Sequence, residues 1–151
     1  MAPTNAPNDV PLTRVVRFFE SLRPEDVARI GELYAADAHF VDPFNDVRGV
    51  AAIERIFAHM FEQLDGPRFV VHERLDAGGQ AFLTWDFEFR FRAGAPTGLQ
   101  RIHGGTHLRF DHDGKVVLHR DYWDAAGELY EKLPLIGAVM RWLRRRAGTP
   151  G

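Results

Sequence analysis

The sequence contains no cysteine in its 151 residues. A disulfide framework, a zinc site built on thiolates and a cysteine nucleophile are therefore excluded, while the redox compartment stays undetermined. Any chemistry must come from oxygen and imidazole groups. A hydrophobic content of 45% in a chain of this length predicts one domain whose core needs neither a disulfide nor a cofactor.

An excess of charge of one sign is also lacking, because the formal net charge is only −2. The sequence has no run of basic residues interleaved with aromatic ones, so nucleic acid is not expected as a partner. It also has no apolar stretch of the length that a membrane span or a secretory signal needs. Residues 1–11 are rich in Pro and Asn, which predicts a flexible leader on a cytoplasmic protein.

Several catalytic motifs are missing as well. The sequence has no Gly-x-Ser-x-Gly elbow and no phosphate-binding loop, which argues against a serine hydrolase and against a nucleotide-dependent enzyme. His103 and His107 are four positions apart in a predicted strand, roughly 13 Å, which is too far for both to bind one ion. We therefore expect neither a metal nor a cofactor.

Apolar residues at helical spacing predict three helices in the first half of the chain. The first covers Leu12–Leu22. The second covers Pro24–Tyr34, where a proline followed by two acidic residues is typical of a helix start. The third begins at Gly49 and ends before Asp65-Gly66-Pro67.

The hydrophobic period then changes to two. This alternation predicts four strands joined by Gly-containing turns, namely Phe69–Leu75, Gln80–Arg92, Leu99–Phe110 and Lys115–Trp123. Consecutive strands with short connections form an antiparallel meander. Three N-terminal helices packed on one face of such a curved sheet give an α+β domain over residues 12–131, with a concave pocket between the layers.

Residues 132–146 predict an apolar C-terminal helix with a basic tip, followed by a tail at 147–151. Its arginines would suit the negative end of the helix dipole if the helix docks on the domain. The alternative is a helix that lies on a membrane surface. The apolar part is short, which favours docking.

The chain is organised around the segment 34–49, which leads from helix through an extended run to helix. Asp42 lies at its centre, before Pro43 and between Phe40 and Phe44. If the carboxylate faces inward, this apolar setting makes it a proton acceptor. The alternative is a turn in which the Asp42 oxygens accept nearby backbone N–H groups.

The order of these elements resembles the NTF2-like superfamily, and within it the SnoaL-like and ketosteroid isomerase-like branch. The resemblance rests on Tyr-Ala-x-Asp-Ala-x-Phe-x-Asp-Pro at 34–43 and on Arg-Asp-Tyr-Trp-Asp at 120–124, and it covers about Leu12–Asp124. It implies a cone-shaped α+β fold that commonly dimerises through the outer face of the sheet. The superfamily includes isomerases, cyclases, epoxide hydrolases and non-enzymes.

The resemblance to ketosteroid isomerase places that enzyme's aspartate base at Asp42. The tyrosine of its oxyanion hole falls at Phe18, and its protonated aspartate falls at Thr106. Phe cannot donate a hydrogen bond and Thr is a weaker donor, so steroid isomerisation by the same mechanism is not expected. The SnoaL-like cyclases use a pocket aspartate, assisted by a histidine, as the acid–base group of an aldol closure.

The last strand carries His119, Asp121 and Trp123 at alternate positions, which places all three on the pocket face in the register that we assign. Strand residues two apart lie roughly 6.6 Å apart, so His119 and Asp121 could act on one substrate oxygen. The alternative is a buried polar pair that bonds neighbouring strands. The catalytic candidates are thus Asp42, His119 and Asp121. The residues expected to contact a ligand are Phe18, Tyr34, Phe57, Phe61, Trp85, Phe87, Thr106 and Trp123.

Three functions are consistent with such a pocket. The first is a cofactor-independent isomerase, cyclase or hydrolase that uses acid–base catalysis on a small hydrophobic carbonyl or ring compound. The second is a non-catalytic module that binds a small or lipid-like molecule, and the third is a dimeric adaptor. Outward residues Glu88, Arg90, Arg109 and Tyr122 form a mixed surface that predicts a homodimer.

Overall fold

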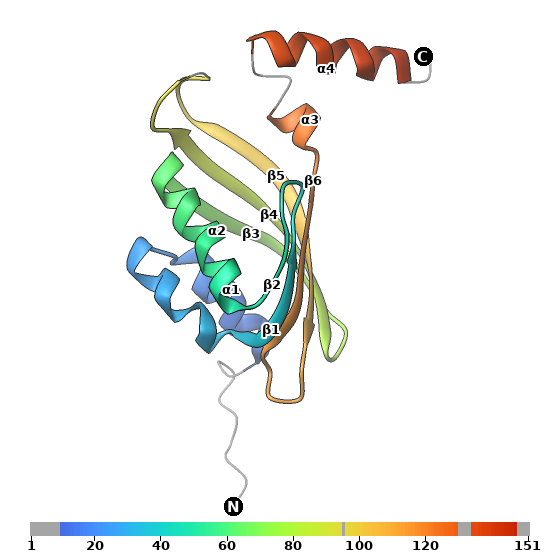
Figure 1. Ribbon diagram of the computed structural model, residues 1–151. Coiled ribbons are helices and arrows are strands. Elements are labelled where there is room, and N and C mark those ends of the chain that lie inside the picture. The colour runs from blue at the N-terminus through green and yellow to red at the C-terminus, as the bar shows by residue number, and fades with distance from the viewer. Residues whose placement is uncertain (1–9, 95, 130–133, 148–151) are drawn as a thin grey trace, which may run out of the picture.

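The protein is described from a computed structural model, in residues 10–94, 96–129 and 134–147. Helices cover one face of a long curved sheet (Figure 1). Along the chain the elements are α1 (Pro11–Glu20), η1 (Pro24–Glu32), β1 (Tyr34–Val41), β2 (Asp46–Arg48), α2 (Val50–Gln63), β3 (Leu64–Asp76), β4 (Gln80–Phe91), β5 (Gln100–Phe110), β6 (Val116–Trp123), α3 (Ala125–Glu128) and α4 (Pro134–Ala147).

The sheet has six strands in the order β2-β1-β6-β5-β4-β3. The meander of β3 to β6 is antiparallel throughout, as the alternation predicts. β1 and β6 are parallel neighbours, so the sheet is mixed rather than wholly antiparallel. The predicted α+β class is confirmed. The prediction of four strands was incomplete, because β1 and β2, which precede α2, also belong to the sheet.

The segment before Asp42 differs most from the prediction. The second helix is a 3₁₀ helix that ends at Glu32, and Tyr34 is the first residue of β1 rather than the last of a helical stripe. The run from Tyr34 to Ala38 contains three alanines, which favour a helix. Pairing with β6 prevails, and its first contact is the bond from the Val116 amide to the Leu33 carbonyl at 2.9 Å.

The third helix also ends differently. β3 begins at Leu64, directly after α2, whereas the alternation predicts a start at Phe69. Asp65-Gly66-Pro67 does not separate the two elements, because it lies within β3 at a register shift against β4. Gly66 takes a positive φ of 58°, a conformation that glycine adopts without strain.

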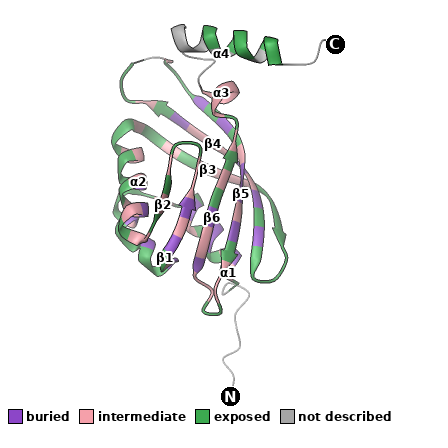
Figure 2. Ribbon diagram, turned by 45° about the vertical axis from the view of Figure 1, so that its right-hand side comes forward, coloured by how far each residue is buried: buried purple, intermediate pink, exposed green. Residues whose placement is uncertain are grey.

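The core lies between the helices and the inner face of the sheet. Figure 2 shows the buried positions alternating along the strands. Val15, Val16 and Phe19 of α1 and Ile53 and Phe57 of α2 supply the helical side of this core. These helices therefore cover the inner face of the sheet. Polar side chains on that face, such as Thr106 and His119, are buried.

The C-terminal helix α4 lies next to α3, beyond one end of the sheet (Figure 1). Its side chains Val139, Trp142 and Leu143 are exposed. The docking of residues 132–146 on the domain stays a prediction, and residues 132 and 133 lie outside the described part of the chain. So do residues 1–9 of the expected leader and residues 148–151 of the expected tail. Within the described ranges, no helix is long and apolar enough to cross a membrane.

Candidate functional site

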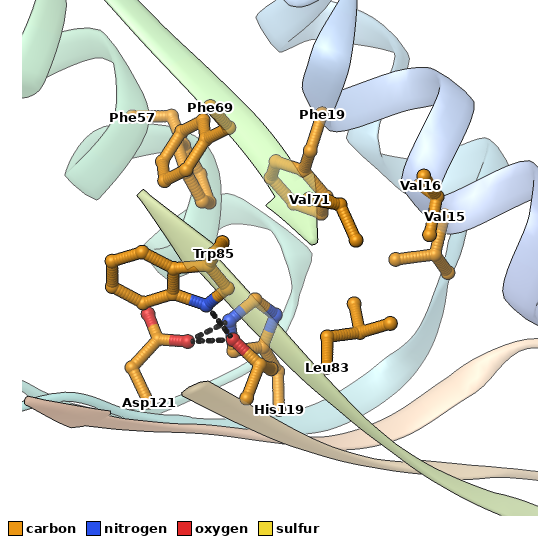
Figure 3. Close-up of a pocket in the computed structure, with 11 residues that line it drawn as sticks. Val15, Val16, Phe19, Phe57, Phe69, Val71, Leu83, Trp85, His119 and Asp121 are labelled. Carbon is orange, nitrogen blue, oxygen red and sulfur yellow. Dashed lines mark hydrogen bonds and ion pairs between the residues drawn. The ribbon is translucent and has the colours of Figure 1, made fainter. Parts of the chain in front are cut away.

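β6 places His119 and Asp121 on the inner face of the sheet, in the register that we assigned from the sequence. Both border an internal cavity of about 40 Å³ beneath α1 and α2 (Figure 3). A space of this size holds a few water molecules at most. Its remaining walls are almost wholly apolar and consist of Val15, Val16, Phe19, Phe57, Phe69, Val71, Leu83, Trp85 and Thr106.

A chain of hydrogen bonds runs through this buried region and ends on Asp121. Trp85 Nε1 donates to Thr106 Oγ1 at 2.7 Å, and Thr106 Oγ1 donates to Asp121 Oδ1 at 2.5 Å. His119 Nε2 lies 2.8 Å from the same oxygen, Asp121 Oδ1. Behind the imidazole, Tyr34 Oη lies 2.6 Å from His119 Nδ1. Five side chains from four strands are thus joined in one network.

The partners in this network determine where the protons lie. Asp121 Oδ1 can only accept, so His119 carries its hydrogen on Nε2. Burial and the Asp121 charge raise the pKa of Tyr34 well above its ordinary value of 10.0, so its hydroxyl is protonated. The only acceptor for that hydroxyl among the described residues is His119 Nδ1. These two contacts fit a ring whose Nε2–H donates to Asp121 Oδ1 and whose Nδ1 accepts from the Tyr34 hydroxyl.

Asp121 is the member of the network with an oxygen that no described residue binds. Its Oδ1 accepts from both His119 and Thr106, whereas no residue in the described part of the chain donates to its Oδ2. The side chain is 17% exposed, against 6% for His119. A proton can therefore bind to Oδ2 without disturbing either bond to Oδ1.

A second and larger pocket, of about 280 Å³, lies between α2 and the sheet, and Asp121 borders it as well. Its wall on β4 consists of the inward side chains Trp85, Phe87, Phe89 and Phe91. On the opposite side lie the α2 side chains Ile56, Phe57 and Met60. The mouth is bordered by Asp42, Phe44, Asn45 and Trp123. Asp121 is thus shared by the small cavity and the aromatic pocket.

Asp42 borders the mouth of the aromatic pocket, but its oxygens are held in a turn. Its Oδ1 accepts from the backbone N–H of Phe44 at 2.8 Å and of Asn45 at 2.7 Å. The Asn45 side-chain amide adds bonds to both Asp42 oxygens, at 3.0 and 3.1 Å. This is the turn that the sequence offered as the alternative for an aspartate before a proline. Asp42 has more donors than Asp121, so its carboxylate is the weaker base candidate.

Of the residues expected to contact a ligand, five border one or both cavities, namely Phe57, Trp85, Phe87, Thr106 and Trp123. Phe18 and Phe61 are not among the described lining residues, because the helices turn their neighbours Phe19 and Met60 inward instead. Tyr34, which was expected to contact a ligand, does not line either cavity. It is buried behind His119 and touches the imidazole rather than a cavity.

Sequence reasoning missed Phe19, Phe69 and Phe44 as lining residues. Phe19 follows Phe18 directly, and spacing alone does not fix which of two adjacent aromatics faces inward. Phe69 stacks on Phe87 with ring centroids 4.5 Å apart, a contact across β3 and β4 that alternation in both strands could have suggested. The ring centroids of Phe44 and Trp123 are 5.5 Å apart. This contact depends on the shape of the turn that holds Phe44, which hydrophobic periodicity does not predict.

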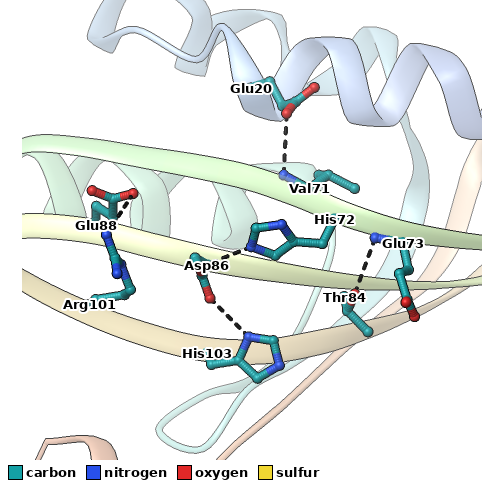
Figure 4. A network of polar contacts seen from close by, with 9 residues as sticks. All are labelled: Glu20, Val71, His72, Glu73, Thr84, Asp86, Glu88, Arg101 and His103. Atoms are coloured by element: carbon teal, nitrogen blue, oxygen red, sulfur yellow. Dashed lines mark hydrogen bonds and ion pairs between the residues drawn. The ribbon is translucent and has the colours of Figure 1, made fainter.

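The outer face of the sheet carries another aspartate–histidine cluster (Figure 4). Asp86 Oδ2 lies 2.9 Å from His72 Nε2, and Asp86 Oδ1 lies 2.9 Å from His103 Nδ1. These two bonds lower the pKa of Asp86 below its ordinary value of 3.8. No group of three or more His, Asp or Glu side chains in the described ranges is arranged to hold a metal ion.

The family model of the SnoaL-like domain matches residues 15–119. The chain belongs to the SnoaL-like domain family. No curated protein matches the sequence. The matched range begins within α1 and ends at His119, so it includes most of the residues that enclose the small cavity.

Solved structures share the fold of this SnoaL-like protein. One is a hypothetical protein with a ketosteroid isomerase-like fold from Catenulispora acidiphila, in complex with trimethylamine, with 20% identity, a TM-score of 0.68 and coverage of 82% of this chain and 93% of that one. Another is an LEH-like epoxide hydrolase from M. tuberculosis, with 19% identity, a TM-score of 0.66 and coverage of 88% and 95%. At such identities the likeness shows the NTF2-like fold and not the activity.

Proposed function

We propose that this SnoaL-like protein is a cofactor-independent acid–base catalyst in which Asp121 takes a proton from a small hydrophobic carbonyl or ring compound. The observation that carries the proposal is the unequal use of the two Asp121 oxygens. Oδ1 accepts hydrogen bonds from His119 and Thr106, while no described residue donates to Oδ2. Asp121 also borders the aromatic pocket. A base in that position is oriented before the substrate binds.

The network also supports Asp121 after it has accepted a proton. His119 Nε2–H and Thr106 O–H point at Oδ1 whether or not Oδ2 is protonated, so the carboxyl group keeps its orientation during a catalytic cycle. Asp121 can then return the proton to another atom of the same substrate. Proton removal and return at different atoms is isomerisation, and removal followed by ring closure is cyclisation.

The same network restricts the substrate. The deep donors Trp85 Nε1–H, Thr106 O–H and His119 Nε2–H are all directed at other side chains, so none is left to stabilise an oxyanion. The substrate must therefore delocalise its own developing charge, as a conjugated carbonyl compound or an electron-poor ring does. This requirement separates the proposed chemistry from steroid isomerisation, which uses an oxyanion hole.

A generic carbon acid with its own electron sink tests the proposal. In nitrobenzisoxazole the base removes the ring C–H proton, the electron pair of that bond forms the nitrile, and the N–O bond breaks to release a coloured nitrophenolate. We expect Asp121→Asn to lower the kcat/KM of this reaction about 100-fold or more. The matched control is Asp86→Asn on the outer face, which should leave kcat/KM within about twofold of wild type.

Equal rates for folded Asp121→Asn and wild type would reject Asp121 as the base. If the wild-type protein binds the probe but turns it over no faster than buffer alone does, the result favours the non-catalytic binding module. Both outcomes require circular dichroism spectra that match the wild type.

The homodimer also remains a proposal of ours. Its support is the outer face of the sheet, where Phe82 and Tyr122 are exposed beside the charged residues of β4 and β5. A mixed surface of this kind suits a homodimer interface. Light scattering at tens of micromolar should give the mass of two chains, and the mass of one chain would reject the dimer.

A further inference from the structure

Among its described lining residues, the aromatic pocket between α2 and the sheet has carboxylates but no basic side chain of Lys or Arg. The carboxylates are those of Asp42 and Asp121. His119 borders the small cavity rather than this pocket, and its contacts with Tyr34 Oη and Asp121 Oδ1 fit a ring with a hydrogen on Nε2 alone. His59, the other titratable lining residue, is at the exposed rim, 3.8 Å from Glu62.

The rest of the wall consists largely of aromatic rings in mutual contact. Phe87 stacks on Phe69 with centroids 4.5 Å apart and touches Phe89 at 5.1 Å. At the mouth, the rings of Phe44 and Trp123 are 5.5 Å apart. The face of an aromatic ring is its negative side, so rings around a cavity attract a cation, most strongly where water is excluded.

Asp121 adds a second reason for a cationic occupant. An ionised carboxylate that is largely buried destabilises the protein unless a charge or several donors compensate it. The described donors to Asp121 are His119 and Thr106, and both bind the same oxygen. A positive group in the pocket would supply the missing compensation at Oδ2.

We propose that the pocket binds an apolar molecule that carries a protonated or quaternary amine. The ammonium group lies among the aromatic rings next to Asp121, and the apolar remainder fills the space against α2. A volume of about 280 Å³ is just below the usual range of ligand pockets, so the molecule is small. The inference does not require the proposed catalysis, because it concerns binding alone.

Binding of two probes of equal shape tests the inference without any catalysis. Phenyltrimethylammonium and tert-butylbenzene differ only in that one carries a positive nitrogen where the other has a carbon. The indole N–H signals of Trp85 and Trp123 report binding by NMR, and exposed Trp142 is an internal reference. We expect the cation to bind at least about tenfold more tightly than the neutral probe.

The variants separate charge from shape. Asp121→Asn should reduce the preference for the cation to less than about threefold while the neutral probe binds as before, and Asp42→Asn should have a smaller effect in the same direction. Asp86→Asn, on the opposite face, should leave the preference unchanged. Equal or tighter binding of tert-butylbenzene to the wild-type protein would overturn the inference, and this result does not depend on the folding of any variant.

The two proposals fail in different ways. A pocket that prefers the cation but shows no Asp121-dependent turnover of nitrobenzisoxazole supports the amine site and rejects the catalyst. Turnover that depends on Asp121, together with no preference for the cation, supports the catalyst and rejects the amine site.

Discussion

Two aspartates on opposite faces of the same sheet bind histidines at nearly the same distance, yet their surroundings differ. The side chains of Asp121 and Asp86 are 17% and 22% exposed, so burial of the carboxylate does not separate them. The exposure of their histidine partners does separate them. His119 is 6% exposed, while His72 and His103 are 45% and 64% exposed.

The second difference is the use of the oxygens. Each oxygen of Asp86 has a histidine of its own, so neither is left for a substrate. Both described partners of Asp121 bind the same oxygen, and Asp121 itself borders a pocket. An aspartate–histidine contact therefore does not by itself indicate catalysis. A base candidate needs enclosed partners and an unoccupied oxygen beside a cavity.

The largest effect on stability is expected at Thr106, which lies on the inner face and donates to Asp121. Thr106→Val removes the acceptor of the Trp85 indole and a donor to Asp121, both in the interior. The free energy of unfolding should fall by about 3 kcal/mol, since two buried polar groups lose a partner. Denaturant unfolding measures the change.

The control is Thr84→Val on the outer side. Thr84 accepts one bond, from the Glu73 amide at 3.2 Å, in an exposed setting (Figure 4). Its loss should cost less than about 1 kcal/mol. Equal costs for the two valines would show that enclosure does not distinguish the two faces.

The next effect concerns the glycine that makes room for Trp85. A Cβ at Gly104 would lie 2.6 Å from the Trp85 ring and 2.9 Å from the Tyr122 carbonyl. Gly104→Ala should lower the free energy of unfolding by about 1–3 kcal/mol and displace the indole from Thr106. Gly31→Ala is the control, because its Cβ would meet Val50 at an ordinary 3.5 Å. A neutral Gly104→Ala would mean that the Trp85 position is not fixed by packing.

Much of this site could be predicted from the sequence, because strand alternation is a strong signal. It places His119, Asp121 and Trp123 on one face of the last strand, and the assigned register makes that face the inner one. The role of Tyr34 could not be predicted, since it depends on β1 lying parallel to β6, a pairing between residues far apart in the chain. The Asp42 turn was foreseen only as one of two alternatives, because the choice depends on Asn45 and Phe44 closing the turn.

A third prediction uses the pH dependence of the inner network. Tyr34→Phe leaves His119 Nδ1 buried without its donor and should cost about 1–2 kcal/mol near neutral pH. Because the pKa of Tyr34 is raised in the folded state, its contribution is present below pH 10.0 and is lost as the pH rises above that value. The gap in melting temperature between wild type and Tyr34→Phe should therefore shrink in alkali. A gap that stays constant would contradict the buried, protonated tyrosine.

The smallest effect belongs to the outer cluster. The pKa of Asp86 is lowered, first by the bond from His103, so its contribution to stability is present above pH 3.8 and is lost as the pH falls through the lower folded value. Asp86→Asn should thus be less stable than wild type near pH 6, by under about 1 kcal/mol, and equal to it in strong acid. A difference that grows in acid would reverse the sign that we assign.

The most direct test of the account is the protonation of the His119 ring, because both the base and the amine site require an Asp121 that no imidazolium neutralises. Heteronuclear NMR of the ring nitrogens distinguishes the forms, and His119→Gln identifies the signals among the seven histidines of the chain. Near pH 7 we expect a bonded hydrogen on Nε2 of His119 and a bare Nδ1 that accepts from Tyr34. Hydrogens on both nitrogens of His119 at that pH would contradict this expectation.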